Sequence, residues 1–406
     1  MTTLRDPSTG SLPTARAPLT AGLLFVLALL SAVAPFATDL YLPAFPAIAG
    51  DLATDATGVQ LTLTAFLVGV AAGQLLIGPL SDRFGRRLPL LIGAIAFVLA
   101  SAATVFAPSL GVLIGARVLQ GLSGAAGMVL GRAVISDLAT GPAAARAMSL
   151  MMIVGGVAPV VAPLLGGVIA EPLGWRGVLA VVLGIAVLML AAVIIGIPET
   201  LPRERRAELA TLKSATGSPL RALASRAYIG YTLTFAFGFT VMMAYISASP
   251  FLYQTMMGLN ELQYGLLFGL NALALMVTSA VSAKLVQRIA TRRLVAVGLV
   301  GVGIGVAAFL ALTLLAVPAW MLAIAVFVAV ASLGFVFGNA TSLALGAVPG
   351  AAGSASAVIG ALQFALAAVV SPLVSVGGGD SAVPLAIVMA AATVICIAAF
   401  ATTRKA

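Results

Sequence analysis

The sequence predicts an all-α integral membrane protein with twelve transmembrane helices, arranged as two pseudo-symmetric six-helix bundles. Three observations support this prediction: the composition, a series of long apolar runs, and the placement of the few charges. Of the 406 residues, 62% are hydrophobic and 8% are charged, and the mean hydropathy is +1.18. An ordinary soluble domain is about 45–50% apolar and about 25% charged, and disordered chains are more polar still. Soluble and disordered classes are therefore excluded.

Twelve apolar runs supply the transmembrane helices. A membrane-crossing helix needs roughly 20 mainly apolar residues, whereas the strands of a membrane β-barrel alternate in polarity. The runs are apolar on every face, so helices are predicted. They cover residues 19–43, 58–80, 88–107, 109–131, 146–170, 175–197, 226–253, 260–283, 293–316, 319–345, 353–377 and 381–402. The first run follows Arg5 and Arg16 without a convincing cleavage site, so we interpret it as a retained helix rather than a signal peptide.

Charge placement predicts the topology. With the N-terminus in the cytoplasm, 19 of the 21 basic residues lie in cytoplasmic segments or at their edges, while Arg176 lies outside and Arg117 within a span. Because cytoplasmic loops are enriched in lysine and arginine, both termini are expected on the cytoplasmic side of the membrane. Eighteen arginines against three lysines, with abundant alanine, glycine and valine, are typical of a GC-rich bacterial genome, so the expected location is a bacterial cytoplasmic (inner or plasma) membrane. The topology also accounts for the net charge of +9 without nucleic acid as a partner.

The chain divides into two halves at its longest connection. The expected segments are a cytoplasmic tail (1–18), an N-terminal six-helix bundle (19–197), a cytoplasmic linker (198–225), a C-terminal six-helix bundle (226–402) and a C-terminal tail (403–406). The loop at 78–88 (GPLSDRFGRRL) is echoed at 283–294 (AKLVQRIATRRL), and an Arg-Arg pair closes both. Such an architecture is typical of transporters, whose substrate site lies near the membrane midplane between the halves.

Apart from charges at the edges of the spans, two charged residues lie within predicted spans. A charge at the centre of a span costs roughly 2.5–3.5 kcal/mol. Arg117 is central in its run, and Asp39 lies in the first run after Pro35, which can open the helix around a cavity. The alternatives are a snorkelling or structural arginine and an outer-face loop aspartate. A buried carboxyl group holds its proton more tightly than an exposed one, and a nearby arginine opposes this. We therefore predict that Asp39 and Arg117 couple transport to protons.

Uncharged polar and aromatic side chains within the spans are candidates for lining the substrate cavity. Each has an alternative role, because polar side chains also bond neighbouring helices and most aromatic rings only pack. The candidates are Tyr41, Phe66, Gln120, Tyr245, Asn271, Phe335, Asn339 and Gln363. There is no histidine, and the single cysteine, Cys396, lies in an apolar run, so no metal site, disulfide or cofactor is expected.

Several motifs resemble the major facilitator superfamily. Residues 78–87 (GPLSDRFGRR) resemble its signature loop between spans two and three, and residues 113–121 (LIGARVLQG) resemble its fourth-span motif built around an arginine. Residues 158–167 (APVVAPLLGG) resemble the fifth-span motif of its proton-coupled antiporters. The segments 38–43 (TDLYLP), 198–202 (PETLP) and 247–253 (SASPFLY) are similar to the bicyclomycin-resistance (Bcr/CflA) group of drug-efflux transporters.

The resemblance implies the major facilitator fold and roles for the motif residues. A cytoplasmic latch that stabilises the outward-facing state would consist of Gly78, Asp82, Arg83, Gly85, Arg86 and Arg87. A fifth-span contact that suppresses leak would be shaped by Ala158, Pro159, Ala162, Pro163, Gly166 and Gly167, with alanine at 158 and 162 where the family often has glycine. Arg117 would influence protonation and drug binding. Some relatives carry an acid about two turns before Asp39, where this chain has Ser31, so Asp39 is the single candidate proton carrier.

The expected function is proton-coupled efflux of small, largely apolar drugs by alternating access, with protons, the drug and the lipid bilayer as partners. The resemblance also implies a monomer. One alternative is proton-coupled uptake of a small metabolite, against which the fifth-span motif and the scarcity of polar residues argue. The other is a non-transport membrane protein. Without histidine, a carboxylate pair in one span or a P-loop, an intramembrane enzyme is not expected.

Overall fold

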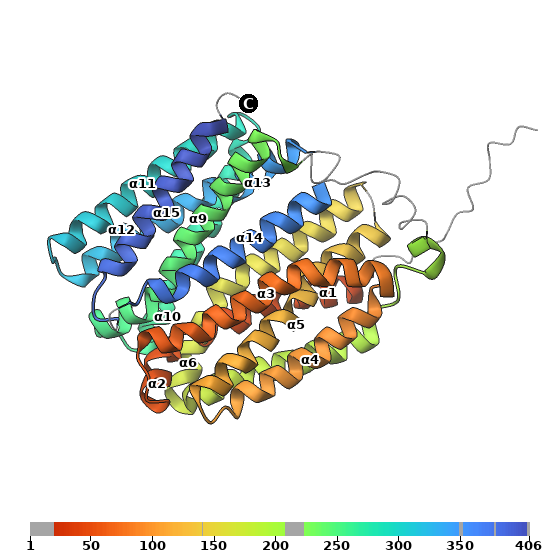
Figure 1. The fold of residues 1–406 in the computed structure, drawn as a ribbon, viewed down its shortest axis with the longest axis horizontal. Coiled ribbons are helices and arrows are strands. Elements are labelled where there is room, and N and C mark those ends of the chain that lie inside the picture. Colours follow the sequence, from red (N-terminus) through yellow and green to blue (C-terminus); the bar gives the residue numbers. More distant parts are fainter. Residues whose placement is uncertain (1–19, 140, 208–222, 349–351, 377–378, 404–406) are drawn as a thin grey trace, which may run out of the picture.

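The computed structural model describes residues 20–139, 141–207, 223–348, 352–376 and 379–403. Within these ranges the chain forms helices joined by short connections, and no strand is present, which confirms the predicted all-α fold. Figure 1 shows two groups of helices, one from the N-terminal part of the chain (red to yellow-green) and one from the C-terminal part (green to blue). Of the expected tails and linker, residues 1–19, 208–222 and 404–406 lie outside the described ranges.

The first group begins with α1 (Ala21–Asp39), which a 3-10 turn, η1 (Leu42–Ala44), connects to the short helix α2 (Phe45–Asp51). Pro35 lies inside α1 and does not end it. The remaining helices of this group are α3 (Ala56–Phe84), α4 (Arg87–Val105), α5 (Leu110–Leu138) and α6 (Gly141–Gly196).

The second group contains α9 (Arg226–Pro250), which continues as a π-helical turn, η2 (Phe251–Met256). The run predicted at 319–345 is broken into two helices by a 3-10 turn. The other elements of this group are α10 (Glu261–Leu285), α11 (Thr291–Leu314), α12 (Ala319–Ser332), η3 (Leu333–Phe335), α13 (Phe337–Gly346), α14 (Ala352–Leu373) and α15 (Val383–Thr402).

Eleven continuous helical segments of the described chain are long and apolar enough to cross a membrane. One of them, Arg146–Gly196, has 51 residues, about twice the length that a crossing needs. Its Gly174 has φ 63° and ψ −176°, which interrupts the helix where the sequence separates the runs 146–170 and 175–197. This segment therefore supplies two of the twelve expected crossings.

Two helices extend beyond their predicted apolar runs. Helix α3 continues to Phe84 instead of residue 80, and α5 continues to Leu138 instead of residue 131. The added turns carry charged side chains, including Asp82 on α3 and Asp137 on α5. A helix that leaves the hydrocarbon core can carry charges without the desolvation cost, so a search for apolar runs stops before the helix does.

The two groups of helices meet along α3 with α14 and along α6 with α10; Figure 1 shows α14 beside α3. Within the described ranges, four hydrogen bonds cross between the groups, and their donors are Thr57, Gln60, Gln254 and Ser371. All four lie at the end of the bundle opposite to residues 21 and 402. Every acceptor is a backbone carbonyl oxygen. Thr57 donates to Ser375 at 2.8 Å and Gln60 donates to Ser247 at 2.9 Å. Gln254 donates to Pro43 at 2.8 Å and Ser371 donates to Gln60 at 3.5 Å. We call these bonds the crossing bonds.

Candidate functional site

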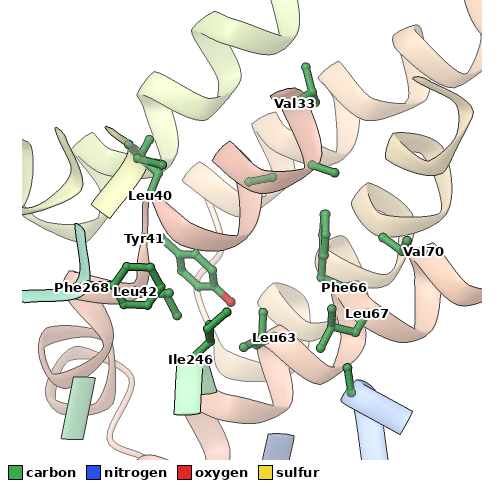
Figure 2. Close-up of a cluster of buried hydrophobic side chains, with 14 of the residues drawn as sticks. Val33, Leu40, Tyr41, Leu42, Leu63, Phe66, Leu67, Val70, Ile246 and Phe268 are labelled. Carbon is green, nitrogen blue, oxygen red and sulfur yellow. The ribbon is translucent and has the colours of Figure 1, made fainter. Parts of the chain in front are cut away.

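Arg117 is completely buried in the first group of helices, between two aromatic rings. Its guanidinium carbon lies 4.3 Å from the ring centroid of Tyr41 and 4.5 Å from that of Phe66. Figure 2 shows the Tyr41 ring among apolar side chains from both groups, such as Leu63 of α3 and Ile246 of α9. Cations bind the faces of aromatic rings, and this attraction is strongest where water is absent. The rings therefore offset part of the cost of burying the charge.

Hydrogen bonds complete the surroundings of Arg117. Its Nη1 donates to the carbonyl oxygen of Ala37 at 2.9 Å and to Oε1 of Gln120 at 2.6 Å. Gln120 in turn donates from Nε2 to the hydroxyl of Ser101 at 2.8 Å. Nη2 of Arg117 has no hydrogen-bond partner, and no carboxylate lies within ion-pair distance of the guanidinium, among the residues that the structure describes. Arg117 is thus a buried cation with polar neighbours but no counter-ion, which is not the environment of a snorkelling arginine.

Asp39 is buried as well, at the last residue of α1. No basic side chain of the described chain forms an ion pair with it. Arg117 and Asp39 are therefore not paired in this structure, although the sequence argument placed an arginine beside the acid. Asp39 lies just before η1, which packs against α9 and α10 of the other group of helices. Asp39 is therefore close in the chain to the boundary between the groups.

A second aromatic group surrounds Tyr245 in the C-terminal helices. The rings of Tyr245 and Phe268 stack with centroids 5.7 Å apart, and Tyr253 lies edge-on to Tyr245 at 6.2 Å. Asn271 donates from Nδ2 to the hydroxyl of Tyr253 at 3.3 Å, and Tyr264 shares a 3.0 Å hydrogen bond with Ser249. Of the predicted cavity residues, the structure therefore gathers Tyr41, Phe66 and Gln120 around Arg117, and Tyr245 and Asn271 in this second group.

Three predicted cavity residues lie elsewhere. Asn339 is buried on α13 and donates to the hydroxyl of Ser282 on α10 at 2.7 Å, as a helix-bonding residue does. Phe335 is half-buried in η3, and Gln363 is half-buried on α14. The sequence argument passed over four half-buried rings from α9, α13 and α14 that contact one another: Phe235, Phe239, Phe337 and Phe364. In the sequence, an aromatic residue in an apolar run that lines a cavity looks the same as one that only packs between helices, so these four rings could not be singled out.

The fifth-span motif lies where three helices meet. A methyl group at Gly166 would collide with the carbonyl oxygen of Leu40 at the end of α1, and one at Gly167 would collide with that of Glu261 at the start of α10. Ala158, Ala162 and Pro163 are buried, and Pro159 is half-buried. The two glycines thus allow α6 to approach the backbone of both groups of helices closely, next to Asp39.

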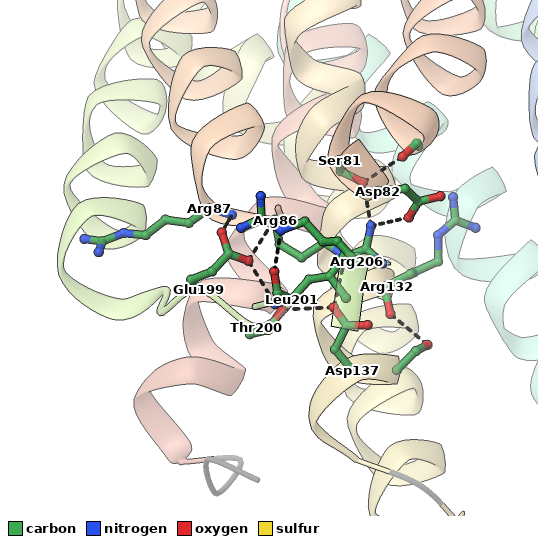
Figure 3. Close-up of polar contacts among 12 residues, drawn as sticks. Ser81, Asp82, Arg86, Arg87, Arg132, Asp137, Glu199, Thr200, Leu201 and Arg206 are labelled. Atoms are coloured by element: carbon green, nitrogen blue, oxygen red, sulfur yellow. Dashed lines mark hydrogen bonds and ion pairs between the residues drawn. The ribbon is translucent and has the colours of Figure 1, made fainter. Parts of the chain in front are cut away.

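Two of the predicted latch residues, Asp82 and Arg86, form a compact polar cluster with Ser81 and Asp137, shown in Figure 3. Arg86 donates from Nε to Oδ2 of Asp137 at 2.9 Å, and from Nη1 to Oδ1 of Asp82 at 2.8 Å and to the Ser81 hydroxyl at 2.6 Å. Burial acts to lower the pKa of Arg86, but the bonds to Asp137 and Asp82 outweigh it and raise the pKa above its ordinary value. Arg86 therefore stays charged and connects the end of α3 to the end of α5.

Glu199 anchors the loop of the latch from the other side. Its Oε1 accepts from the backbone N–H of Arg86 and of Leu201, each at 2.9 Å, and its Oε2 accepts from that of Arg87 at 3.3 Å. A carboxylate at the first amides of α4 is favourable because these donors have no partner within the helix. Gly85 adopts φ +90°, and any Cβ there would collide with this carboxylate, so the position requires glycine.

The remaining latch residues contribute less. Arg83 and Arg87 are exposed, and Gly78 supplies the carbonyl oxygen that accepts from Ser81. Asp137, Glu199 and Thr200 were not predicted as latch residues, although Thr200 donates to Oδ2 of Asp137 at 3.0 Å. Glu199 and Thr200 belong to the motif at 198–202, which the sequence analysis used only for the family resemblance. The sequence alone does not reveal that this motif contacts the loop at residues 85–87.

The repeated loop of the second group uses its arginine differently. Arg292 donates from Nη1 to the hydroxyls of Tyr231 and Thr403, at 3.1 and 2.5 Å, and its guanidinium carbon lies 4.6 Å from the ring centroid of Phe400. No carboxylate pairs with Arg292 in the described part of the chain. The charged cluster is therefore a property of the first group.

Comparison with known proteins agrees with this architecture. Residues 27–372 match the Major Facilitator Superfamily. An MFS-type transporter of Bacillus subtilis, YdgK, is 36% identical over 93% of this chain and 94% of its own, and a bicyclomycin resistance protein homolog of Haemophilus influenzae is 31% identical over 93% and 94%. Among solved structures, a D-xylose-proton symporter superposes with a TM-score of 0.75 at 17% identity, covering 92% of this chain and 96% of the symporter, so the likeness extends to the fold alone.

The predicted resemblance is thereby confirmed. The structure agrees with the fold of a solved transporter, and the sequence matches relatives over nearly its whole length. The chain belongs to the Major Facilitator Superfamily of multi-pass membrane transporters, in its Bcr/CflA-like group.

Proposed function

We propose that this protein exports small, largely apolar compounds, antibiotics among them, in exchange for protons. The observation that carries this proposal is the surroundings of Arg117. A buried guanidinium without a counter-ion can accept a hydrogen-bonding or anionic partner, and its two aromatic neighbours suit a flat, apolar compound. The similarity to a bicyclomycin resistance protein homolog supports an antibiotic as one substrate.

Asp39 is the proposed proton carrier. It is a buried carboxyl group without an ion pair in the described chain, and it lies just before η1, which packs against α9 and α10 of the other half. Protonation would remove a charge at the point where the halves separate during alternating access. A proton that crosses about 100 mV releases roughly 2.3 kcal/mol, which supports more than tenfold accumulation of a neutral compound.

The crossing bonds support an alternating-access cycle. They close the end of the bundle that, in the predicted topology, faces away from the cytoplasm. The latch would form and release at the opposite end, which holds Arg86, as the halves rock. We place the protein in the bacterial cytoplasmic membrane with both termini inside, acting as a monomer.

Transport assays in an efflux-deficient bacterium test the proposal. We expect the wild type to lower the accumulation of bicyclomycin or chloramphenicol several-fold, and an uncoupler to abolish the effect. Asp39→Asn should lose this proton-driven export, and in vesicles of purified protein it should keep exchange of labelled for unlabelled drug. Arg117→Lys should lose both activities, because one ammonium cannot reproduce the contacts of the guanidinium fork.

Exposed residues provide matched controls for charge and composition. Asp380→Asn and Arg288→Lys change residues that are exposed and make no ion pair in the described chain, so both should export like the wild type. Full export by Asp39→Asn would contradict its role as the proton carrier. A wild type that raises the accumulation of a test compound in a proton-dependent way would instead identify an uptake symporter.

A further inference from the structure

An apolar groove of about 610 Å³ lies on the outer surface of the first group of helices, and neither Arg117 nor any residue of the crossing bonds lines it. Helices α3 and α4 both pack against α5 but touch each other little, so a channel remains between them above α5. Leu80 and Phe84 of α3 and Ile92 and Leu99 of α4 form its walls. Its volume lies within the range of about 300–1,000 Å³ that is typical of ligand sites.

Small residues form the bed of the groove. Gly93, Ala96 and Ala100 lie on one face of α4, because positions three and four apart share a face of a helix. Ser123 is the one polar side chain among the lining residues, and its hydroxyl already donates to the carbonyl oxygen of Leu119 at 2.6 Å. The groove therefore offers no free polar side chain, so an occupant must be apolar along its whole length.

A cationic side chain lies at one end of the groove. Phe84 lines this end, and the guanidinium carbon of Arg83 lies 5.3 Å from the centroid of its ring. Arg83 is exposed, and no ion pair that it forms is present among the residues of the described ranges. An apolar channel with an unpaired arginine at its mouth fits an acyl chain whose headgroup carries a negative charge.

We propose that this groove binds one acyl chain of an anionic phospholipid, with the phosphate on Arg83. In the predicted topology the mouth lies at the cytoplasmic surface, where anionic lipids are present. The bound lipid bridges the end of α3 and the length of α4, beside the latch loop. The site is separate from the proposed transport path, so its test does not depend on which compound the protein carries.

Native mass spectrometry of the purified protein tests this assignment. The protein is released from nanodiscs that contain equal amounts of phosphatidylglycerol and phosphatidylethanolamine. We expect one retained phosphatidylglycerol per protein molecule. Ala96→Phe, which places a ring in the groove, should reduce its retention at least tenfold. Arg83→Gln should reduce it about fivefold, the equivalent of about 1 kcal/mol for one arginine near an anionic surface.

Two exposed substitutions outside the groove control for composition and charge. Ile195→Phe adds a ring at an exposed position of α6, and Arg288→Gln removes an exposed arginine from the second group of helices. Both should retain lipid like the wild type. Unchanged retention in Ala96→Phe would overturn the assignment. So would equal retention of the two lipids, a retained free fatty acid in place of a phospholipid, or a dimer that Ala96→Phe dissociates.

Substitutions at Arg83 and Ala96 are expected to leave the fold intact, so a loss of lipid retention can be assigned to the groove. Arg83 is exposed and Ala96 is half-buried at the groove, so neither substitution disturbs the core of the bundle. Folding is checked by the elution volume and thermal unfolding of each variant in detergent. If Ala96→Phe does not fold, Arg83→Gln alone decides, because loss of retention there supports the headgroup contact and wild-type retention contradicts it.

Discussion

Arg86 binds Asp137 across the junction of three helices, with Nε of the arginine 2.9 Å from Oδ2 of the aspartate and both side chains largely buried. We expect Asp137→Ala to lower the free energy of unfolding by about 1.5–3 kcal/mol, because a buried charged donor loses a charge-assisted partner while Asp82 remains. Chemical unfolding of the purified protein in detergent measures this loss. Asp137→Asn should cost less, since it keeps an acceptor. Equal stability of Asp137→Ala and the exposed control Asp380→Ala would contradict the role assigned to Asp137.

The contacts of Glu199 predict an effect on amide hydrogen exchange at the start of α4. Glu199→Ala removes the acceptor from the amides of Arg86, Arg87 and Leu201, so the start of α4 should open more readily. We expect amide hydrogen exchange at residues 86–88 to accelerate about tenfold, as the loss of a helix cap of about 1–1.5 kcal/mol implies. Glu204→Ala, an exposed acid of the same segment, is the control and should leave these rates unchanged. Slow exchange in both variants would show that Glu199 does not hold the loop.

The fifth-span glycines predict a contrast within one helix. Gly166→Ala places a methyl group against the backbone oxygen of Leu40, whereas Gly155→Ala places one in open space. We expect Gly166→Ala to cost about 1–3 kcal/mol of stability through overpacking and to impair transport. Gly155→Ala should be neutral or slightly stabilising, because alanine is the better helix former. Thermal unfolding together with drug accumulation separates the two variants, and equal behaviour would refute close packing at Gly166.

The crossing bonds predict a shift in conformation. Gln60→Leu removes the donor to Ser247, which we expect to cost the closed end about 0.5–1.5 kcal/mol and to raise the open population several-fold. Spin labels at the exposed positions Gly50 and Asp380, with Cys396→Ala in the background, report the opening as longer distances in pulsed electron resonance. Gln263→Leu, whose side chain bonds only within its own helix end, serves as the control. Unaltered distances in Gln60→Leu would argue against a gate at this end.

The fold could be predicted from the sequence because a helix that crosses lipid must be a run of roughly 20 mainly apolar residues, which is easily recognised. Arg117 was found for the same reason, since a charge in an apolar run has few tolerated explanations. Asp137 and Glu199 were missed because each stands in an ordinary polar segment at a helix end. Their importance arises from contacts with Arg86, which is 51 residues from Asp137 and 113 from Glu199 in the chain.

The expected partnership of Asp39 and Arg117 shows a second limit. Both lie in apolar runs, and their charges suggest a pair, but Arg117 finds its neighbours in Tyr41, Phe66 and Gln120 instead. In a soluble protein, an apolar stripe along a helix shows which of its faces packs against other helices, and so which side chains can meet. In these spans almost every face is apolar, so that pattern is missing.

The choice of acceptors in the crossing bonds has a consequence for how such a protein tolerates mutation. Every acceptor is a main-chain oxygen, so a substitution on the accepting side leaves the bond in place. Only the donating side chain is constrained, and the two faces of the gate need not change in concert during evolution. Because a carbonyl oxygen has two lone pairs, an acceptor inside a helix, such as that of Gln60, can accept the crossing bond beside its helical bond. The constraint at this contact therefore falls on four donor side chains, two from each group of helices.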